Sequence, residues 1–365
     1  MKKEKKALIQ KLGEKYIDKT TSKFTSKKSQ AYILSDLQKK NLRKISIQTY
    51  LFAALIGALA VLIVVLPHHI WPNLFGIQKF NLFGNKFDFE AYYTLFAILL
   101  LFPEIWALNY INLRAVKKIC IICNYPNKQR KDYEEQIAIL SDAGLEIQAN
   151  HLKSFSIDPY IGLSKFSYYS VFLLNKLKAT LLNLVVKILI KRFMGRYALR
   201  IVTDLAGIPV FAFWNAWASR SIIKETRMRI MATTATDDFL EEISVEDLKK
   251  IEDKIGLIFN FVAQSKRSYN FAMYVYFKEV VKLIPNLNLK ITHEIQEEEL
   301  FTGEVEKDRL IAKLLIFGLI IDGSLSIKEK LVLKNLCEHT WFPYSVDELE
   351  LAVDGFCDGK GLPLL

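Results

Sequence analysis

Two apolar stretches in the first third of the chain form its clearest hydrophobic pattern. The first runs from Tyr50 to Pro67 and has 18 residues without a charge. As a helix it would be about 27 Å long, close to the ~30 Å hydrocarbon thickness of a bilayer. The second begins at Ala91 and reaches that length only if it continues to about residue 113. The pattern predicts a two-helix transmembrane hairpin over residues 48–113, and a buried helix of a soluble domain is the alternative for the first stretch.

The second stretch contains one acidic residue, Glu104, directly after Pro103. An ionisable side chain inside a membrane costs free energy and often marks a function, so Glu104 is a candidate intramembrane polar site. The structural alternative is a proline-kinked helix in which Glu104 is protonated, paired with a lysine, or close to the cytoplasmic face. Both interpretations stay open at this point.

Basic residues flank the predicted hairpin on both sides. They are Lys39, Lys40, Arg43 and Lys44 before it, and Arg114, Lys117 and Lys118 after it. The connection 68–90 has two lysines, Lys79 and Lys86, so the positive-inside rule places both termini in the cytoplasm. This predicts a multi-pass protein of a bacterial cytoplasmic (inner) membrane. The connection repeats Asn-Leu-Phe-Gly and is rich in aromatic residues, which predicts a loop in the outer interface.

Small residues recur at four-residue spacing in the first span, as Ala53 with Gly57 and Ala54 with Ala58. Such pairs let another helix approach closely. The expected partner is the second span of the same chain. A homo-oligomer formed through the same residues is the alternative.

The region 114–231 combines dense apolar residues with a basic stripe. The basic residues that we expect to bind lipid are Lys176, Lys187, Lys191, Arg192, Arg196 and Arg200. Together with Thr180 and Asn183, the three lysines form a polar stripe with steps of three or four residues, and the three arginines follow at steps of four. This predicts basic amphipathic helices that lie against anionic lipid or pack on the hairpin. Two further crossings, around 170–190 and 205–219, are the alternative, but they would place basic residues outside, against the positive-inside rule. A third possibility is a cytoplasmic helical core whose lysines face solvent.

Residues 232–365 have the pattern of a cytoplasmic all-α domain. Ser244, Ser326 and Ser345 each precede a carboxylate by three residues, which is typical of a helix N-terminus. The last two fit the capping box, and the first approximates it with Asp247. Taken with the two spans and the basic region, this makes the expected fold class all-α.

The stretch 314–330 has an apolar helix, an Asp-Gly turn at Asp322, and a Ser-capped helix. This order resembles the central hairpin of the tellurite-resistance TerB-like helical domain, over residues 309–357. The resemblance implies proposed metal binding and membrane-linked stress complexes, and by position it carries over to Asp322 and Glu329. A tight turn followed by a helix cap explains the same two residues without an ion. The turn does not have the glycine and carboxylate positions of an EF-hand.

The chain as a whole resembles an uncharacterised family of bacterial membrane proteins with a two-span N-terminal hairpin. The shared block comprises Gly195-Arg196, Gly207-Ile208-Pro209, Trp214-Asn215-Ala216-Trp217, Arg220 and the segment 225–229. That resemblance covers about residues 110–365 and implies no activity.

The charge distribution separates the two ends of the chain. Of 365 residues, segment 1–47 carries 14 Lys and Arg against 4 Asp and Glu, whereas 232–365 carries 15 against 24. The net charge of +11 therefore does not come from a basic DNA-reading domain, and we expect no nucleic-acid partner. Mean hydropathy is +0.16, which is high for a soluble protein.

The sequence has no common catalytic or nucleotide-binding signature. Phosphate-loop, dinucleotide, nucleophile-elbow and zincin motifs are absent from it. Cys120 and Cys123 have the spacing of zinc ligands but lack a second pair, so packing or S-acylation explains them as well. Cys337, His339 and Cys357 lack an evident fourth ligand. We expect no cofactor.

These observations predict a non-enzymatic membrane protein with four consecutive segments. They are a basic N-terminal segment (1–47), the hairpin (48–113), the basic region (114–231) and the acidic domain (232–365). The expected function is a membrane-anchored binding or scaffold protein related to envelope stress, with membrane lipids and a protein partner of the acidic tail. A small transporter or channel subunit that uses Glu104 is the alternative.

Overall fold

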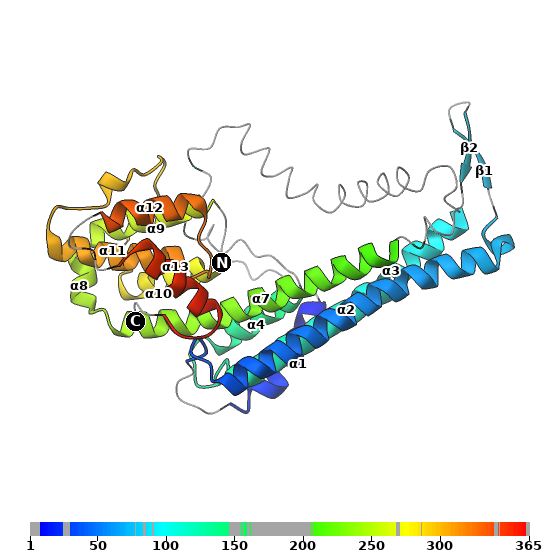
Figure 1. Cartoon of the computed structure of the whole chain (residues 1–365), viewed down its shortest axis with the longest axis horizontal. Coiled ribbons are helices and arrows are strands. Elements are labelled where there is room, and N and C mark those ends of the chain that lie inside the picture. Colours follow the sequence, from blue (N-terminus) through cyan, green and yellow to red (C-terminus); the bar gives the residue numbers. More distant parts are fainter. Residues whose placement is uncertain are drawn as a thin grey trace. The chain divides into compact units, whose positions relative to one another are not determined.

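The chain is all-α, apart from one short β-hairpin, in a computed structural model (Figure 1). The structure describes residues 8–24, 30–76, 78–82, 85–89, 91–145, 155, 157–158, 161, 205, 207–267, 271–285, 287–338, 342 and 344–362. The expected fold class is thereby confirmed.

The helices fall into three long ones and a set of shorter ones. The long helices are α2 (Asp36–Ile70), α3 (Ala91–Cys123) and α7 (Gly207–Glu241). The others are α1 (Leu8–Thr21), α4 (Tyr133–Gly144), α8 (Val245–Lys250), α9 (Glu252–Lys266), α10 (Phe271–Leu283), α11 (Val305–Ile320), α12 (Ile327–Cys337) and α13 (Val346–Cys357). Short 3-10 helices are η1 (Pro72–Phe75) and η4 (Glu297–Glu299).

Contacts divide the chain into two compact units. Unit 1 comprises residues 1–42, 119–168 and 225–365, and unit 2 comprises 43–118 and 169–224. This division cuts across the four consecutive segments predicted from the sequence. The reason is that α2, α3 and α7 each contribute residues to both units, so one helix can carry an apolar section and a section with a polar surface.

Two helices of the described residues are long and apolar enough to cross a membrane, namely α2 and the Leu95–Cys123 part of α3. Both helices extend beyond the uncharged stretches from which the spans were predicted. α3 passes through Arg114, Lys117 and Lys118 and ends at Cys123. Charged side chains end a membrane-compatible stretch, but they do not end a helix, because their backbone groups still form the helical hydrogen bonds.

In unit 2, α2 buries a narrow stripe of residues at four-residue spacing, which includes Ala53, Gly57, Val61 and Val65. The would-be Cβ of Gly57 lies 2.6 Å from the carbonyl oxygen of Phe211 on α7. A side chain at this position would therefore collide with backbone. The close helix approach predicted for Gly57 is confirmed, but its partner is α7 and not the second span.

The connection between α2 and α3 is not the simple loop expected from the sequence. After η1 it forms an antiparallel hairpin of β1 (Gln78–Leu82) and β2 (Asn85–Phe89), in which Leu82 pairs with Asn85. After its first residue, each strand alternates polar and apolar residues (Lys-Phe-Asn-Leu and Lys-Phe-Asp-Phe), the two-residue period of a β-strand. Next to the hairpin, His68 and Phe75 pack on Tyr93 of α3, with ring centroids 4.4 and 5.9 Å apart.

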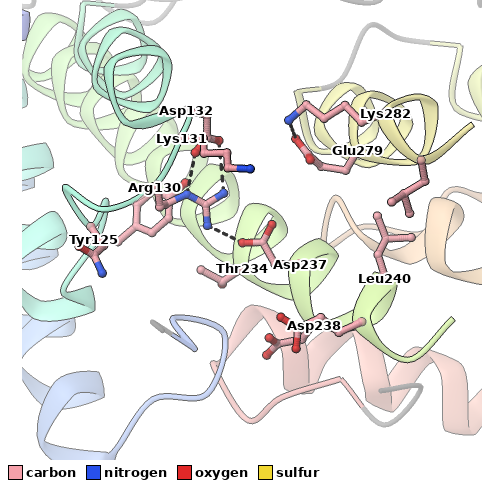
Figure 2. Close-up of a pocket in the computed structure, with 13 residues that line it drawn as sticks. Tyr125, Arg130, Lys131, Asp132, Thr234, Asp237, Asp238, Leu240, Glu279 and Lys282 are labelled. Atoms are coloured by element: carbon pink, nitrogen blue, oxygen red, sulfur yellow. Dashed lines mark hydrogen bonds and ion pairs between the residues drawn. The ribbon is translucent and has the colours of Figure 1, made fainter. Parts of the chain in front are cut away.

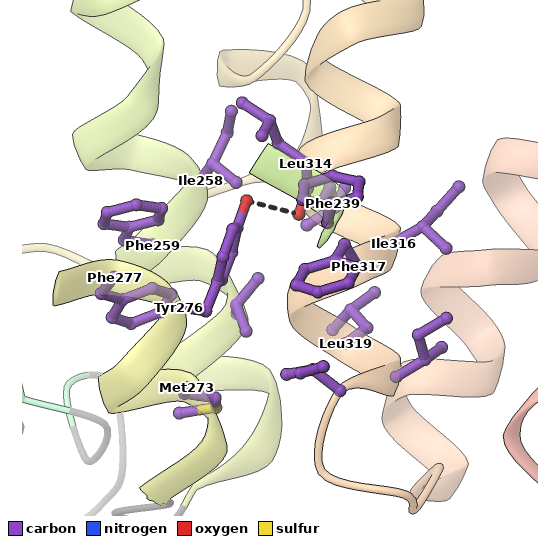
Figure 3. Close-up of a cluster of buried hydrophobic side chains, with 14 of the residues drawn as sticks. Phe239, Ile258, Phe259, Met273, Tyr276, Phe277, Leu314, Ile316, Phe317 and Leu319 are labelled. Atoms are coloured by element: carbon purple, nitrogen blue, oxygen red, sulfur yellow. Dashed lines mark hydrogen bonds between the residues drawn. The ribbon is translucent and has the colours of Figure 1, made fainter. Parts of the chain in front are cut away.

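Within the core of unit 1, aromatic side chains of α7, α9, α10 and α11 pack on one another among aliphatic side chains (Figure 3). Phe239 stacks on Phe317 with centroids 3.8 Å apart, and Phe259 stacks on Phe277 at 4.0 Å. Tyr276 lies between these two stacks, and its hydroxyl donates to the carbonyl oxygen of Leu314 at 3.1 Å. Its phenol is thus buried with a partner, and burial raises its pKa.

The N-terminal helix also belongs to unit 1. Tyr133 at the start of α4 donates to Asp18 of α1 at 2.8 Å and lies 2.9 Å from the hydroxyl of Thr21. Gln10 donates to Asp142 at the other end of α4, at 3.1 Å. α1 is therefore docked on α4, which the basic composition of 1–47 did not predict.

The predicted helix starts in 232–365 are confirmed. Ser244 accepts a hydrogen bond from the backbone of Asp247, and Ser326 with Glu329 and Ser345 with Glu348 form capping boxes.

We predict that Gly57→Ala destabilises the chain although it gains about 1 kcal/mol of helix propensity. The added methyl meets the backbone of α7, and overpacking of this kind costs about 1–3 kcal/mol. The measurement is the thermal unfolding midpoint in detergent. Gly207→Ala is the matched control, because its Cβ would lie 3.6 Å from Val61, an ordinary contact. Equal midpoints for the two variants would contradict the close approach.

Candidate functional site

A charged cavity of about 570 Å³ lies in unit 1 (Figure 2). Its walls are formed by the loop that precedes α4, by α7 and by α10. Its lining residues are Tyr125, Asn127, Arg130, Lys131, Asp132, Thr234, Asp237, Asp238, Leu240, Glu241, Glu279, Lys282 and Leu283. Three of these side chains are basic and five are acidic.

Arg130 organises one wall of the cavity. Its guanidinium donates to both carboxylate oxygens of Asp132, at 2.9 and 3.2 Å, and to Asp237 of α7 through Nη1. The guanidinium carbon also lies 5.7 Å from the ring centroid of Tyr125. Bidentate pairing fixes the plane of the guanidinium, so Arg130 ties the loop before α4 to α7.

The two carboxyls that share Arg130 have opposite pKa shifts. Burial disfavours the charge on Asp132, but hydrogen bonds from Arg130 and Gln136 and the charge of Arg130 outweigh burial and lower its pKa. At Asp237 burial is the strongest influence and raises the pKa, although Arg130 also donates to this carboxyl. Asp132 is therefore the ionised partner of Arg130 across a wider pH range.

Other walls of the cavity carry further charges. Asp238 accepts hydrogen bonds from the hydroxyl of Tyr32 at 2.6 Å and from Gln30 at 3.2 Å. On α10, Lys282 donates to Glu279 at 2.6 Å. Because Arg130 and Lys282 are already paired, the excess of acid in the lining favours a cationic or mixed-charge partner over an anion.

Several charged side chains of the cavity are held in place by partners. Arg130 pairs with Asp132 and Asp237, and Lys282 pairs with Glu279. Burial is the main cause that raises the pKa of the Tyr125 phenol above its ordinary value. Groups held in this way present a fixed pattern of charge to a partner.

The residues carried over from the TerB-like resemblance lie elsewhere in unit 1, around Lys266. The ammonium of Lys266 at the end of α9 lies 2.9 Å from Asp322, 2.6 Å from Glu329 and 3.2 Å from the carbonyl oxygen of Ser324. Only 3% of the Lys266 side chain is exposed. The structure thus places Asp322 and Glu329 on either side of one lysine ammonium, which is their shared cation.

Local structure explains the same residues. Gly323 has a left-handed φ of 67°, which the turn requires, and the backbone of Ser324 donates to Asp322 at 3.0 Å. Glu329 accepts from the backbone of Ser326 at 2.7 Å as part of the capping box. Burial raises the pKa of Asp322, and Lys266 opposes the rise. Among the described residues, no group of three or more His, Cys, Asp and Glu side chains could hold a metal ion, and the metal site stays a prediction.

Glu104, the predicted intramembrane polar residue, lies in unit 2 with a partner on α7. Asn215 donates to its carboxylate at 2.9 Å. Further along the same two helices, Ser219 donates to Asn112 at 2.8 Å. Neither Asn215 nor Ser219 was singled out as a partner for α3 from the sequence, although Asn215 stands out in the aromatic run 211–217.

The other candidate residues are the predicted lipid-binding residues and the cysteines. The predicted lipid-binding residues Lys176, Lys187, Lys191, Arg192, Arg196 and Arg200 lie outside the described residues. Cys120 and Cys123 are both buried at the end of α3. Cys357 donates to the carbonyl oxygen of Gly323 at 3.2 Å, so it supports the Asp-Gly turn.

Comparison of the chain with family models, curated proteins and solved structures finds no match.

We predict opposite pH trends for Asp132→Asn and Asp237→Asn. The stability from a lowered pKa is present above the ordinary Asp value of 3.8 and is lost as the pH falls through the folded value. The stability from the raised pKa of Asp237 is present below 3.8 and is lost as the pH rises through the folded value. Relative to the parent, Asp132→Asn therefore becomes less stable as the pH rises, whereas Asp237→Asn becomes more stable.

The measurement is the unfolding midpoint as a function of pH on both sides of the ordinary Asp value of 3.8. At neutral pH we expect Asp132→Asn to lose about 1–3 kcal/mol, the usual effect of removing a charged partner from a buried hydrogen bond. Parallel trends for the two variants would show that Arg130 does not discriminate between the carboxyls.

We also predict that Lys266→Met destabilises unit 1 by about 3–5 kcal/mol, because it leaves two buried carboxylates without their cation. Combining it with Asp322→Asn and Glu329→Gln removes the uncompensated charge and recovers most of the loss. Lys313→Met is the control, since its pair with Glu242 is more exposed and contributes about 1 kcal/mol or less. Chemical denaturation in detergent measures all of these variants. A Lys266→Met variant as stable as Lys313→Met would contradict the buried cluster.

Proposed function

We propose that this chain is a membrane-anchored, non-enzymatic scaffold of a bacterial inner membrane. α2 and α3 cross the bilayer as the anchor, both termini are cytoplasmic, and unit 1 binds a protein partner at the cytoplasmic face. This extends the sequence hypothesis, with the charged cavity of unit 1 added as the binding site.

One observation carries the anchor: the apolar side chains of α2 and α3 point outward. In the most apolar 18-residue stretch of each helix, 28% of α2 and 6% of α3 is buried within the chain. A core helix of a soluble protein would be mostly buried, because water disfavours apolar surface of this extent. Phe102 and Trp106 of α3 are 68% and 69% exposed. Lipid is the surrounding that explains these side chains.

Charge supports the proposed orientation. Lys and Arg gather on both flanks of the hairpin and are few in its connection, which matches the positive-inside rule. Acidic residues exceed basic ones in 232–365 and in the lining of the charged cavity. The partner that fits this surface is a protein segment rich in Lys or Arg.

The contacts of Glu104 support a structural role over transport. Asn215 already donates to its carboxylate at 2.9 Å, so Glu104 holds α7 against α3. Pairing of this kind satisfies a polar group in an apolar setting without a transported ion.

We predict that the full chain stays in the membrane fraction after washes at high salt and alkaline pH, and dissolves only in detergent. The double variant Leu55→Lys/Leu59→Lys should be recovered largely in the soluble or aggregated fraction. Each lysine near the centre of a span costs about 2.5–3.5 kcal/mol of insertion free energy.

The control is Leu351→Lys on α13, because Leu351 is also an exposed leucine but lies in unit 1. It should leave membrane recovery unchanged. A parent chain that is released by salt alone, or a double variant that partitions like the parent, would contradict the anchor.

A further inference from the structure

We infer that the first part of α7, residues 207–219, is a third membrane-embedded helix, and that its outward aromatic side chains contact lipid acyl chains. The inference rests on the proposed anchor, since it takes α2 and α3 as the helices that fix the depth. It reverses the preference from sequence, where the basic residues before α7 favoured a cytoplasmic or interfacial location for the whole region.

Contacts with α2 set the level of α7 within unit 2. The would-be Cβ of Gly57 lies 2.6 Å from the carbonyl oxygen of Phe211, and that of Gly207 lies 3.6 Å from Val61. The two helices therefore run antiparallel, with residues 57–61 beside 207–211. Residues 57–61 are the middle of the uncharged stretch of α2, so a bilayer that surrounds this stretch also surrounds the start of α7.

Contacts with α3 satisfy the polar side chains of α7. Asn215 donates to Glu104 at 2.9 Å, and Ser219 donates to Asn112 at 2.8 Å. Ser219 and Asn112 are both buried. Polar groups at membrane depth need partners within the protein, and interhelical pairs of this kind are how membrane helices provide them.

The outer face of α7 is aromatic and uncharged. Phe213 and Trp217 are 53% and 54% exposed, and each ring packs on the other with centroids 5.9 Å apart. Residues 207–219 contain no charged side chain and extend over about 20 Å as a helix. This surface continues the exposed apolar faces of α2 and α3, so the occupant that fits it is the same lipid hydrocarbon.

Basic residues of α2, α3 and α7 lie at about the same level, at one end of the three packed helices. Continuing the antiparallel register places Lys44 of α2 level with Lys224 of α7, and the Ser219–Asn112 pair places the basic end of α3 near the same level. The residues are Arg43, Lys44, Arg114, Lys117, Lys118, Arg220 and Lys224. No Asp or Glu occurs in 43–50, 108–118 or 216–224. Such an end matches anionic headgroups of the cytoplasmic leaflet.

The inference concerns α7 alone, because residues 162–204 lie outside the described residues.

The test is the depth of a nitroxide spin label in vesicles of phosphatidylcholine and phosphatidylglycerol. The full chain carries a single cysteine, after replacement of Cys120, Cys123, Cys337 and Cys357 by alanine. Labels are placed at Phe213 of α7 and at Leu55 of α2, which the register puts level with it. Ser324, exposed in unit 1, is the aqueous control.

We expect labels at Phe213 and Leu55 to collide with dissolved oxygen far more than with a water-soluble nickel chelate. Their depths should agree within about one helical turn, ~5 Å. The label at Ser324 should show the opposite preference. Trp217→Cys, on the same exposed face as Phe213, repeats the measurement if Phe213→Cys lowers the unfolding midpoint.

The outcomes separate this inference from the proposed anchor. A label at Phe213 that behaves like Ser324, while Leu55 stays in lipid, overturns the inference and leaves the anchor intact. Aqueous behaviour at both Phe213 and Leu55 overturns the anchor itself. A label at Phe213 shielded from both reagents shows a protein partner on this face, such as a second copy of the chain, and overturns lipid contact.

Discussion

Apolar side chains that face outward over about five turns of a helix set the main constraint on this molecule. α2 and α3 bury little of their most apolar surface within the chain. Water around that surface would favour collapse or aggregation, whereas hydrocarbon is neutral toward it. In hydrocarbon, burial no longer drives helices together, so close backbone approach and interhelical hydrogen bonds have to do so. Gly57 against α7 and Asn215 with Glu104 supply these two kinds of contact.

Unit 1, in contrast, buries its apolar side chains in a core of its own. Its α9, α10 and α11 bury aromatic side chains in one core, in which Tyr276 keeps its hydroxyl bonded to a carbonyl oxygen. Its charges are mostly arranged in pairs, among them Arg130 with Asp132 and Lys266 with Glu329. A water-exposed helical body can carry an excess of acid in this way, and the resulting negative field is the basis of the proposed binding of a basic partner.

The sequence predicted the local features of the fold and missed the long-range ones. The apolar stretch from Tyr50 to Pro67 and the capping pairs at Ser326 and Ser345 depend on neighbouring residues, and so the pattern alone located them. The β-hairpin after η1 was not predicted, because each strand has five residues and its two-residue alternation is short. That alternation was a usable signal.

The candidate site shows the same limit. Arg130 joins residues separated by more than a hundred positions, and nothing in the segment 125–132 indicates that Asp237 will be its partner. Likewise, the small residue Gly57 predicted a close helix without identifying α7, because the spacing of small residues describes one surface and not its complement. Asp322 and Glu329 were identified as a pair, but Lys266, 56 positions away from Asp322, was not.

The Lys266 cluster also affects how any ion could bind there. A divalent ion approaching Asp322 and Glu329 would have to compete with an ammonium that is tethered to α9 and so has a high effective concentration at the carboxylates. Occupancy would then be an exchange of cations, and the displaced lysine would have to leave a nearly dry position for water. Ion uptake at this turn would therefore be linked to a movement at the end of α9. Lys266 would have to move away before an ion could bind to the loop between α11 and α12.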